Sequence, residues 1–269
     1  MKGLCIENLT VGYGRRHVLK QLNLTVAPGE TVAVLGANGC GKTTLLRAIT
    51  GAIKPISGEI RVDGVDLSTL NARHRAAVVA TMPQVCEAEP GLSGMDRIEM
   101  SFFPEKGLFG RLTAEERDRV RAMASEFDIL SLLDRDLAAM SAGERQLIFL
   151  LSAAVRPTPV LLLDEPTSAL DFQRTEEFFA LTARLAQQGR AILTVLHDPT
   201  AAVRHTSSIL LIDEASAERI DLTAPDYDAV ERSLRRLYPH LKIHRDPLFC
   251  LSEREIERKK GKETPHAEH

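Results

Sequence analysis

The segment 36–43, with the sequence GANGCGKT, constrains this chain more than any other feature. It matches the phosphate-loop pattern GxxxxGKT and lies between a β-branched run at 31–35 and helix-forming residues at 42–50. Glycines allow successive backbone N–H groups to turn toward phosphate oxygens, and the start of the following helix adds a favourable potential. A merely flexible glycine-rich turn is a weak alternative in this context. We therefore predict a strand, loop and helix unit that binds the phosphates of a nucleotide.

The side chains of this loop have separate expected roles. Lys42 is expected to reach the β- and γ-phosphates and so to take part in catalysis, while the Thr43 hydroxyl is expected to bind Mg²⁺. The expected cofactors are therefore ATP and Mg²⁺. The residues expected to contact the nucleotide in this segment are Gly36, Asn38, Gly39, Cys40, Gly41, Lys42, Thr43 and Thr44.

Two adjacent carboxylates, Asp164 and Glu165, follow the apolar run 160–163. Side chains at the carboxyl end of a buried parallel strand emerge at the ligand-binding edge of the sheet. Asp164 is expected to orient Mg²⁺, and Glu165 is expected to polarise the water that attacks the phosphate. Taken alone, such a pair is more often a solvated strand end. Together with the phosphate loop, it predicts ATP hydrolysis.

The composition excludes several classes of protein. With 269 residues, 44% hydrophobic and 26% charged, the chain suffices for one large α/β domain or two small ones. A formal net charge of −3 without a basic stripe argues against nucleic acid as a partner. The start of the chain lacks a signal-peptide pattern, and its apolar runs are far below the roughly 20 residues that span a bilayer, so we expect a cytosolic protein. The isolated cysteines are expected to be reduced thiols rather than zinc ligands or disulfides.

The order of the patterns predicts an α/β fold. Two alternating runs, 4–9 and 18–26, predict an antiparallel β subdomain at the N-terminus. A strand is expected at 78–82, and a mainly helical segment at 112–137. Strands at 160–163, 191–196 and 208–212, with a helix at 172–187, then predict a mostly parallel sheet. Beyond them we expect a helix at 226–237, two short strands within 241–251, and a disordered end at 253–269.

A third motif, MSAGERQ at 140–146, stands upstream of the two carboxylates, and with it the chain resembles the ATP-binding cassette (ABC) family, whose signature is usually LSGGQ. The resemblance implies a head-to-tail homodimer in which Ser141, Gly143 and Glu144 cap the γ-phosphate bound to the partner subunit. The same residues also form a capping box, an ordinary helix start, and both interpretations can hold together. Met140, Ala142 and Glu144 depart from the usual signature, so affinity or rate is expected to differ from the family's.

Four further residues match family motifs in the family's order, and each also has an ordinary structural interpretation. Tyr13 is similar to the tyrosine that stacks on adenine, but could be a turn aromatic. Gln84 is similar to the glutamine that senses Mg²⁺ and couples to the permease, but could be a surface amide. Asp171, in SALD, resembles the loop that communicates across the dimer, but could start a helix. His197 resembles the switch histidine at the γ-phosphate, and the resemblance makes it catalytic together with Glu165.

The family resemblance covers residues 1–212 and implies a domain arrangement. It predicts an ABC ATPase domain at 1–222 with an α-helical subdomain at about 86–156, followed by a C-terminal extension at 223–269. Segments 96–112 and 232–245 are similar to importer subunits for iron-siderophore, haem and vitamin B12 uptake. This similarity implies transmembrane permease subunits as partners, an indirect extracytoplasmic substrate-binding protein, and a peripheral place at the cytoplasmic face of the membrane.

Other functions within and outside transport stay open at this point. An importer of molybdate or another small solute is an alternative, as is a soluble ABC ATPase of DNA repair, iron–sulfur assembly or translation. Repair-type members carry a long coiled coil between the motifs, and translation-type members usually carry two cassettes; neither pattern is visible here. A purely regulatory nucleotide binder is a third alternative, against which the presence of Glu165 argues.

Overall fold

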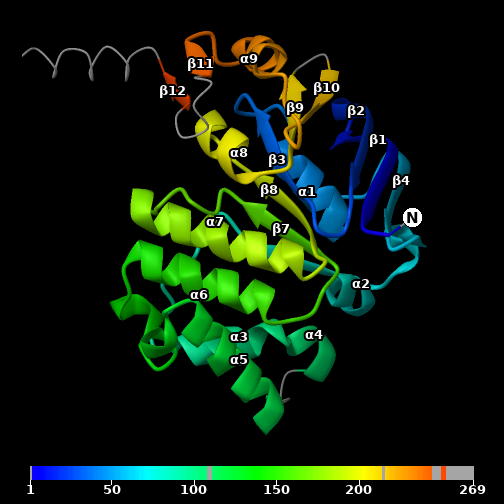
Figure 1. The fold of residues 1–269 in the computed structure, drawn as a ribbon. Helices are drawn as coiled ribbons and strands as arrows, with labels where there is room; N and C mark the ends of the chain where they lie inside the picture. The colour runs from blue at the N-terminus through cyan, green and yellow to red at the C-terminus, as the bar shows by residue number, and fades with distance from the viewer. Residues whose placement is uncertain (1, 108–110, 214–215, 244–249, 253–269) are drawn as a thin grey trace, which may run out of the picture.

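The computed structural model describes residues 2–107, 111–213, 216–243 and 250–252. Its core is a six-stranded sheet in the order β10-β9-β3-β8-β7-β6 (Figure 1). All neighbours in this sheet are parallel except β10, which pairs antiparallel with β9. The strands are β3 (Thr31–Gly36), β6 (Val79–Met82), β7 (Val160–Asp164), β8 (Ala191–Val195), β9 (Ser208–Asp213) and β10 (Ser216–Asp221).

The central strands are buried on both faces, which explains why their sequences are apolar without alternation. Every residue of β3 and of β8 is buried. One face of the sheet is covered by a second, antiparallel sheet in the order β2-β1-β4-β5 together with α1 (Lys42–Thr50). The strands of this second sheet are β1 (Leu4–Tyr13), β2 (Arg16–Val26), β4 (Ser57–Val62) and β5 (Val65–Asp66).

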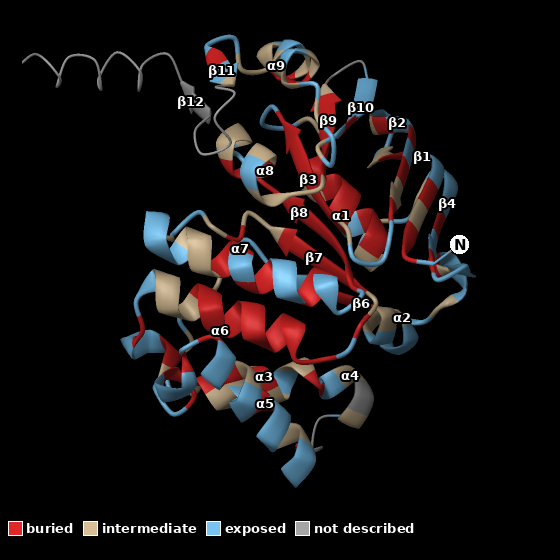
Figure 2. Cartoon of the chain, in the orientation of Figure 1, coloured by how far each residue is buried: buried red, intermediate tan, exposed pale blue. Residues whose placement is uncertain are grey.

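Helices cover the other face of the core sheet. Figure 2 shows α6 as an almost wholly buried helix beside α7, and its residues from Gln146 to Ala154 are all buried. The helices are α2 (Ala72–Val78), α3 (Gly94–Ser101), α4 (Phe103–Lys106), α5 (Ala114–Glu126), α6 (Ala142–Ala154), α7 (Phe172–Gln187), α8 (Pro199–His205) and α9 (Tyr227–Arg235). Short 3₁₀ turns are η1 (Leu67–Thr69), η2 (Leu130–Leu132) and η3 (Leu137–Ala139), and β11 (Leu241–Ile243) pairs antiparallel with β12 (Cys250–Ser252).

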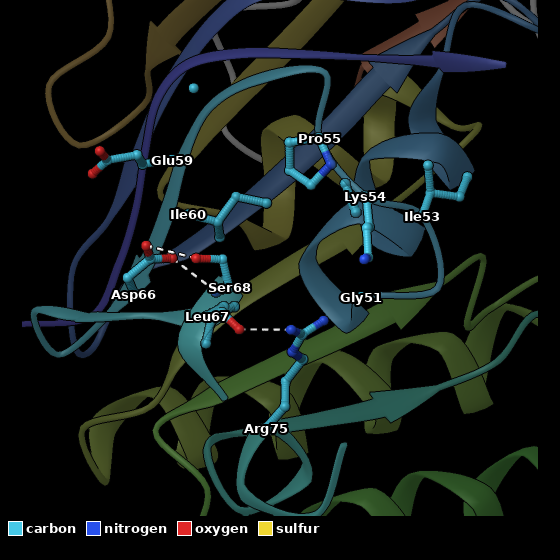
Figure 3. Close-up of a pocket in the computed structure, with 12 residues that line it drawn as sticks. Gly51, Ile53, Lys54, Pro55, Glu59, Ile60, Asp66, Leu67, Ser68 and Arg75 are labelled. Carbon is cyan, nitrogen blue, oxygen red and sulfur yellow. Dashed lines mark hydrogen bonds between the residues drawn. The ribbon is translucent and has the colours of Figure 1, made fainter. Parts of the chain in front are cut away.

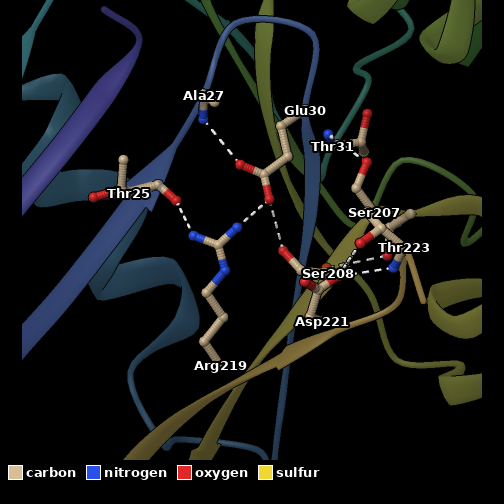
Figure 4. A network of polar contacts seen from close by, with 10 residues as sticks. Thr25, Ala27, Glu30, Thr31, Ser207, Ser208, Arg219, Asp221 and Thr223 are labelled. Atoms are coloured by element: carbon tan, nitrogen blue, oxygen red, sulfur yellow. Dashed lines mark hydrogen bonds and ion pairs between the residues drawn. The ribbon is translucent and has the colours of Figure 1, made fainter. Parts of the chain in front are cut away.

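A polar network ties the antiparallel sheet to the edge of the core sheet (Figure 4). The Glu30 carboxylate accepts a hydrogen bond of 2.9 Å from the Ser208 hydroxyl and forms an ion pair with Arg219. Arg219 also donates a hydrogen bond of 2.5 Å to the carbonyl oxygen of Thr25 on β2. One arginine on β10 therefore holds the turn before β3 in place.

The structure confirms most of the expected elements and corrects one. The helices expected at 42–50 and 172–187 have these bounds, and the strand pair expected within 241–251 is present. The expectation of a mainly helical 112–137 is wrong beyond Glu126, because Asp128 adopts a left-handed backbone with φ of 53° and the chain continues in 3₁₀ turns. The stretch 253–269, whose end is expected to be disordered, lies outside the described residues. Across the described part of the chain, no helix is both long and apolar enough to span a membrane.

Candidate functional site

The phosphate loop curls around the ammonium group of Lys42. This side chain is only 6% exposed, and its Nζ donates hydrogen bonds to the carbonyl oxygens of Gly36 at 2.8 Å and Ala37 at 3.1 Å. Gly39 and Gly41 have φ angles of 81° and 115°, in the left-handed region that favours glycine. The loop therefore has the shape of a cradle with a buried cation at its base.

Close packing leaves room only for glycine at two positions of this loop. A Cβ on Gly36 would lie 2.5 Å from Cys40 Sγ, and a Cβ on Gly41 would lie 2.8 Å from side-chain atoms of Val18 and Leu19. The helix α1 starts at Lys42 without a side-chain cap and without an acidic residue in its first turn. Its first N–H groups and its dipole are therefore directed at the space where phosphate oxygens fit.

Asp164 ends β7 with a carboxylate that lacks a partner. Its Oδ1 is buried and accepts no hydrogen bond. Burial, and next the charge of Glu165, raise the pKa of Asp164, whereas Arg47 and Lys42 partly lower it. A buried acidic oxygen that accepts no hydrogen bond suits a hard cation such as Mg²⁺.

The protein residues near Asp164 favour a cation that is bound partly by the phosphates of a nucleotide. No group of three His, Cys, Asp or Glu residues in the described ranges could hold a metal ion by itself. Mg²⁺ commonly binds through one or two protein ligands plus substrate phosphates, and the half-buried Thr43 hydroxyl belongs to the same cradle. The residues present therefore fit Mg²⁺ as a companion of a nucleotide.

Glu165 stands between two side chains from neighbouring strands. The Gln84 amide, after β6, donates a hydrogen bond of 2.6 Å to Glu165 Oε2, and the His197 Nε2, after β8, contacts Glu165 Oε1. The Glu165 backbone has a φ of 50°, which is costly for a residue with a side chain and is characteristic of functional turns. Parallel pairing of β6, β7 and β8 brings these three residues to one sheet edge.

A hollow of about 340 Å³ opens beside this carboxylate. Glu165 and His197 line one part of it, and Leu170 and the 71% exposed Phe172 line another. It therefore gives the carboxylate access to a water-sized or larger group. A different hollow, of about 390 Å³, lies between the end of α1 and β4, where Arg75 donates a hydrogen bond of 2.6 Å to the Leu67 carbonyl oxygen (Figure 3).

Tyr13 lies at the end of β1, next to α1, with 49% of its surface exposed. Its hydroxyl accepts a hydrogen bond of 3.2 Å from Arg47. Hydrogen bonding by Thr44, and then by Arg47, lowers the pKa of Tyr13. The structure thus places an exposed aromatic ring beside the helix that follows the phosphate loop.

The signature segment forms the capping box that its sequence predicts. The Ser141 hydroxyl accepts from the Glu144 N–H at 3.2 Å, and Glu144 accepts from the Ser141 N–H at 2.7 Å and pairs with Arg135 at 2.7 Å. These contacts lower the pKa of Glu144, the Ser141 N–H being the largest cause. A Cβ on Gly143 would lie 3.2 Å from Leu170, so this glycine faces the turn before α7.

The structure does not bring the signature segment to the phosphate loop of the same chain. The helix α6 packs in the cluster on one face of the core sheet, whereas α1 packs in the cluster on the other face. Asp171 lies near the signature instead, where it caps α7 by accepting from the Arg174 N–H at 2.8 Å. The expected site residues therefore fall into two groups on one chain.

Sequence reasoning missed two residues at the site. Arg47 contacts Tyr13 and influences Asp164, and its place in the last turn of the loop helix was a usable signal. Tyr238, in the C-terminal segment, donates a hydrogen bond of 3.5 Å to the carbonyl oxygen of His197. No local pattern around Tyr238 indicates this contact, because it depends on how α9 packs.

Comparison with known proteins agrees with this geometry. Residues 19–168, more than half of the chain, match the family model described as ABC transporter. The chain is 31% identical over 231 residues to the iron(3+)-hydroxamate import ATP-binding protein FhuC of Bacillus subtilis (strain 168), covering 84% of this chain and 86% of the relative. It is 33% identical over 223 residues to the hemin import ATP-binding protein HmuV of Pseudomonas entomophila (strain L48), covering 81% and 86%.

A solved structure gives the same result. A metal-chelate type ABC transporter in an inward-facing conformation superposes with a TM-score of 0.76 at 26% identity, covering 93% of this chain and 96% of that chain. The motifs, the strand order and the relatives all indicate the same family. This chain therefore belongs to the ABC transporter family, as one of its ATP-binding, ATP-hydrolysing members.

Proposed function

We propose that this chain powers an ABC importer that takes up iron-siderophore, haem or cobalamin-type compounds through a membrane permease. The observation that carries the proposal is the position of Glu165 between Gln84 and His197, one residue after the unpartnered carboxylate of Asp164. Such an edge can bind a charged phosphate chain and position a water molecule. The names of the relatives, which import iron(3+)-hydroxamate and hemin, support the class of cargo.

The first step is nucleotide binding. The main-chain N–H groups of the loop and Lys42 bind the phosphates, and Tyr13 stacks on the adenine ring. Mg²⁺, held by Thr43, Gln84 and Asp164, would neutralise charge on the phosphates. The Lys42 ammonium group, which donates to the carbonyl oxygens of Gly36 and Ala37 in this structure, would then donate to phosphate oxygens.

The second step is attack by water on the γ-phosphate, which forms a new P–O bond, breaks the bond to the oxygen that bridges to the β-phosphate, and releases ADP and phosphate. Glu165 accepts a proton from the water, while His197 contacts the γ-phosphate and holds the Glu165 carboxylate from the side. In-line attack needs a fixed direction for the water, and the strained backbone at Glu165 together with its two partners supplies that direction.

Dimerisation follows from the separation of the two groups of residues. One chain holds a complete phosphate cradle on one face of its sheet and a Ser141–Gly143–Glu144 helix start in the cluster on the other face. A homodimer placed head to tail lets each signature segment cap the nucleotide bound by the other subunit. Asp171, which caps α7 near the signature segment, would pass a change in one half-site to the other.

The chain would act as one subunit of a larger membrane assembly. We place the chain at the cytoplasmic face of the membrane as a peripheral subunit, bound to permease subunits and served indirectly by an extracytoplasmic substrate-binding protein. Within the chain, residues 1–222 form the ATPase domain, about 86–156 its helical subdomain, and 223–269 a C-terminal extension. ATP binding joins the two ATPase subunits, and hydrolysis separates them. The permease subunits, which are bound to them, follow this movement.

Substrate-dependent uptake in a deletion strain tests this proposal. Cells lacking the chain are supplied with ferric siderophores, haem or vitamin B12 side by side. They are complemented with either the unchanged chain or Glu165→Gln. We expect the loss of one uptake, restored only by the unchanged chain. Normal uptake of all three compounds in the deletion strain would contradict this class of cargo and favour another solute or a role outside transport.

A further inference from the structure

The C-terminal segment from α9 to β11 is firmly attached to the core. Val230 and Leu234 are 3% and 0% exposed, and both belong to the helical cluster that covers the core sheet. The Ser233 hydroxyl donates a hydrogen bond of 2.9 Å to Glu218 on β10, and within the segment the Arg235 Nε donates one of 2.8 Å to the Leu241 carbonyl oxygen. This segment therefore has a defined position relative to the sheet (Figure 1).

Tyr238 follows α9 and is directed at the nucleotide site. Its backbone N–H donates to the Leu234 carbonyl oxygen at 2.9 Å, and its carbonyl oxygen accepts from the Leu241 N–H at 2.9 Å. The main chain is thus fixed on both sides. The hydroxyl of the half-buried ring donates a hydrogen bond of 3.5 Å to the carbonyl oxygen of His197.

Ionisable groups from the phosphate loop and from the turn after β8 lie near this hydroxyl. Burial, and then the nearby groups of Asp198 and Cys40, raise the pKa of Tyr238. Asp198 directly follows His197, and Cys40 lies within the phosphate loop. A tyrosine hydroxyl is protonated at neutral pH even with its ordinary pKa of about 10, so Tyr238 is a hydrogen-bond donor there.

His197 is therefore held at two points. Its ring contacts the Glu165 carboxylate, and its main chain accepts the hydrogen bond from Tyr238. Half of the His197 side chain is exposed, at 50%, so burial alone does not fix the ring. A donor to the backbone restricts the turn between β8 and α8 without occupying the ring nitrogens.

We propose that Tyr238 is a positioning residue, through which the C-terminal segment fixes the turn that carries His197 during ATP hydrolysis. This inference rests on the proposed function, because it assumes that His197 acts at the γ-phosphate. The C-terminal segment would then support catalysis in addition to packing against the core.

Tyr238→Phe tests the proposal because it removes the hydroxyl and keeps the ring. Tyr227→Phe, in the first turn of α9, is the matched control on the same segment. Each full-length variant is assayed for kcat and KM of ATP hydrolysis, for its midpoint of thermal unfolding, and for hydrogen exchange of the peptide around His197. For Tyr238→Phe we expect kcat to fall about 2–10-fold, the effect of one hydrogen bond, with KM and unfolding unchanged. Hydrogen exchange around His197 should become faster, and Tyr227→Phe should match the unchanged chain.

Two results would overturn the inference. One is an unchanged kcat and unchanged exchange in Tyr238→Phe. The other is a loss of kcat that accompanies a lower midpoint of unfolding or appears equally in Tyr227→Phe, which would mean that the segment only packs. Failure of the proposed function itself looks different, because the deletion strain would then take up all three compounds normally, whatever the kcat of Tyr238→Phe.

Discussion

The side-chain amide of Gln84 donates a hydrogen bond of 2.6 Å to the carboxylate of Glu165, although the two residues lie 81 positions apart in the chain. The contact joins the segment that leads into the helical layer to the residue that we propose as the base. His197 contacts the other oxygen of Glu165, so the carboxylate is held from both sides. A carboxylate can accept about four hydrogen bonds, so Glu165 keeps acceptor capacity for the attacking water while both partners stay in place.

Gln84→Ala is expected to lower the rate of ATP hydrolysis about 10-fold, because a hydrogen bond to a charged group that orients it is lost. Nucleotide binding in the absence of Mg²⁺ should stay close to normal, since the cradle around Lys42 does not depend on this amide. Steady-state ATPase assays and nucleotide titration measure the two effects. Gln188→Ala, at an exposed position after α7, is the matched control. An equal loss in both variants, or no loss in either, would speak against a role for this contact.

Asp164→Asn is expected to abolish Mg²⁺-dependent hydrolysis and to stabilise the nucleotide-free protein at pH 7.5. A buried carboxylate oxygen without a hydrogen bond is costly, so its neutral replacement should raise the midpoint of thermal unfolding by about 2–4 °C, or about 1 kcal/mol. The cost of burial is present only where Asp164 is ionised. Because burial raises the pKa of Asp164, the difference from the unchanged chain should shrink as the pH falls through that raised pKa.

The control for this prediction is Asp118→Asn, because the Asp118 side chain is 77% exposed and should not alter the midpoint at any pH. Thermal unfolding at several pH values measures the effect without any need for activity. A midpoint that falls in Asp164→Asn, or a difference that grows toward low pH, would show that Asp164 has a favourable partner in the folded protein.

Cys40 is expected to make ATP hydrolysis sensitive to thiol alkylation, with ATP protecting the enzyme. Its sulfur lies inside the phosphate loop, and burial raises its pKa, so the thiolate fraction and the rate of modification should increase with pH. Cys86, whose pKa burial raises to about 11, should react more slowly. Residual activity after alkylation, with the modified cysteine identified by mass spectrometry, measures the effect in the unchanged chain and in Cys40→Ser. Full activity after complete modification of Cys40 would refute this prediction.

The sequence predicted those parts of the site that depend on local patterns. The loop 36–43 could be placed because its strand, glycines and helix are contiguous, and α7 could be bounded because Asp171 caps it and its apolar period is regular. Parallel strands that end in polar residues also brought Glu165 and His197 to one edge, as expected.

Some strands, contacts and helix ends could not be predicted from the sequence, because they depend on packing between distant segments or on a single backbone turn. The short strands β4 and β5 have exposed residues at most positions, so their apolar pattern is weak. The contact of Tyr238 with His197 joins residues 41 positions apart and depends on the docking of α9. The end of α5 was missed because Asp128 turns the chain in a conformation that its sequence allows but does not require.

ATP-dependent dimerisation of Glu165→Gln tests the central claim most directly. Without the base, a bound nucleotide persists, so size exclusion with ATP and Mg²⁺ should show a dimer, while hydrolysis falls about 100-fold or more. The double variant Lys42→Ala/Glu165→Gln is the control and should stay monomeric, because its cradle has lost the buried ammonium. A dimer that forms only in Glu165→Gln with ATP is the result that this account predicts. A monomer under the same conditions, with ATP shown to be bound, would contradict the two-subunit site.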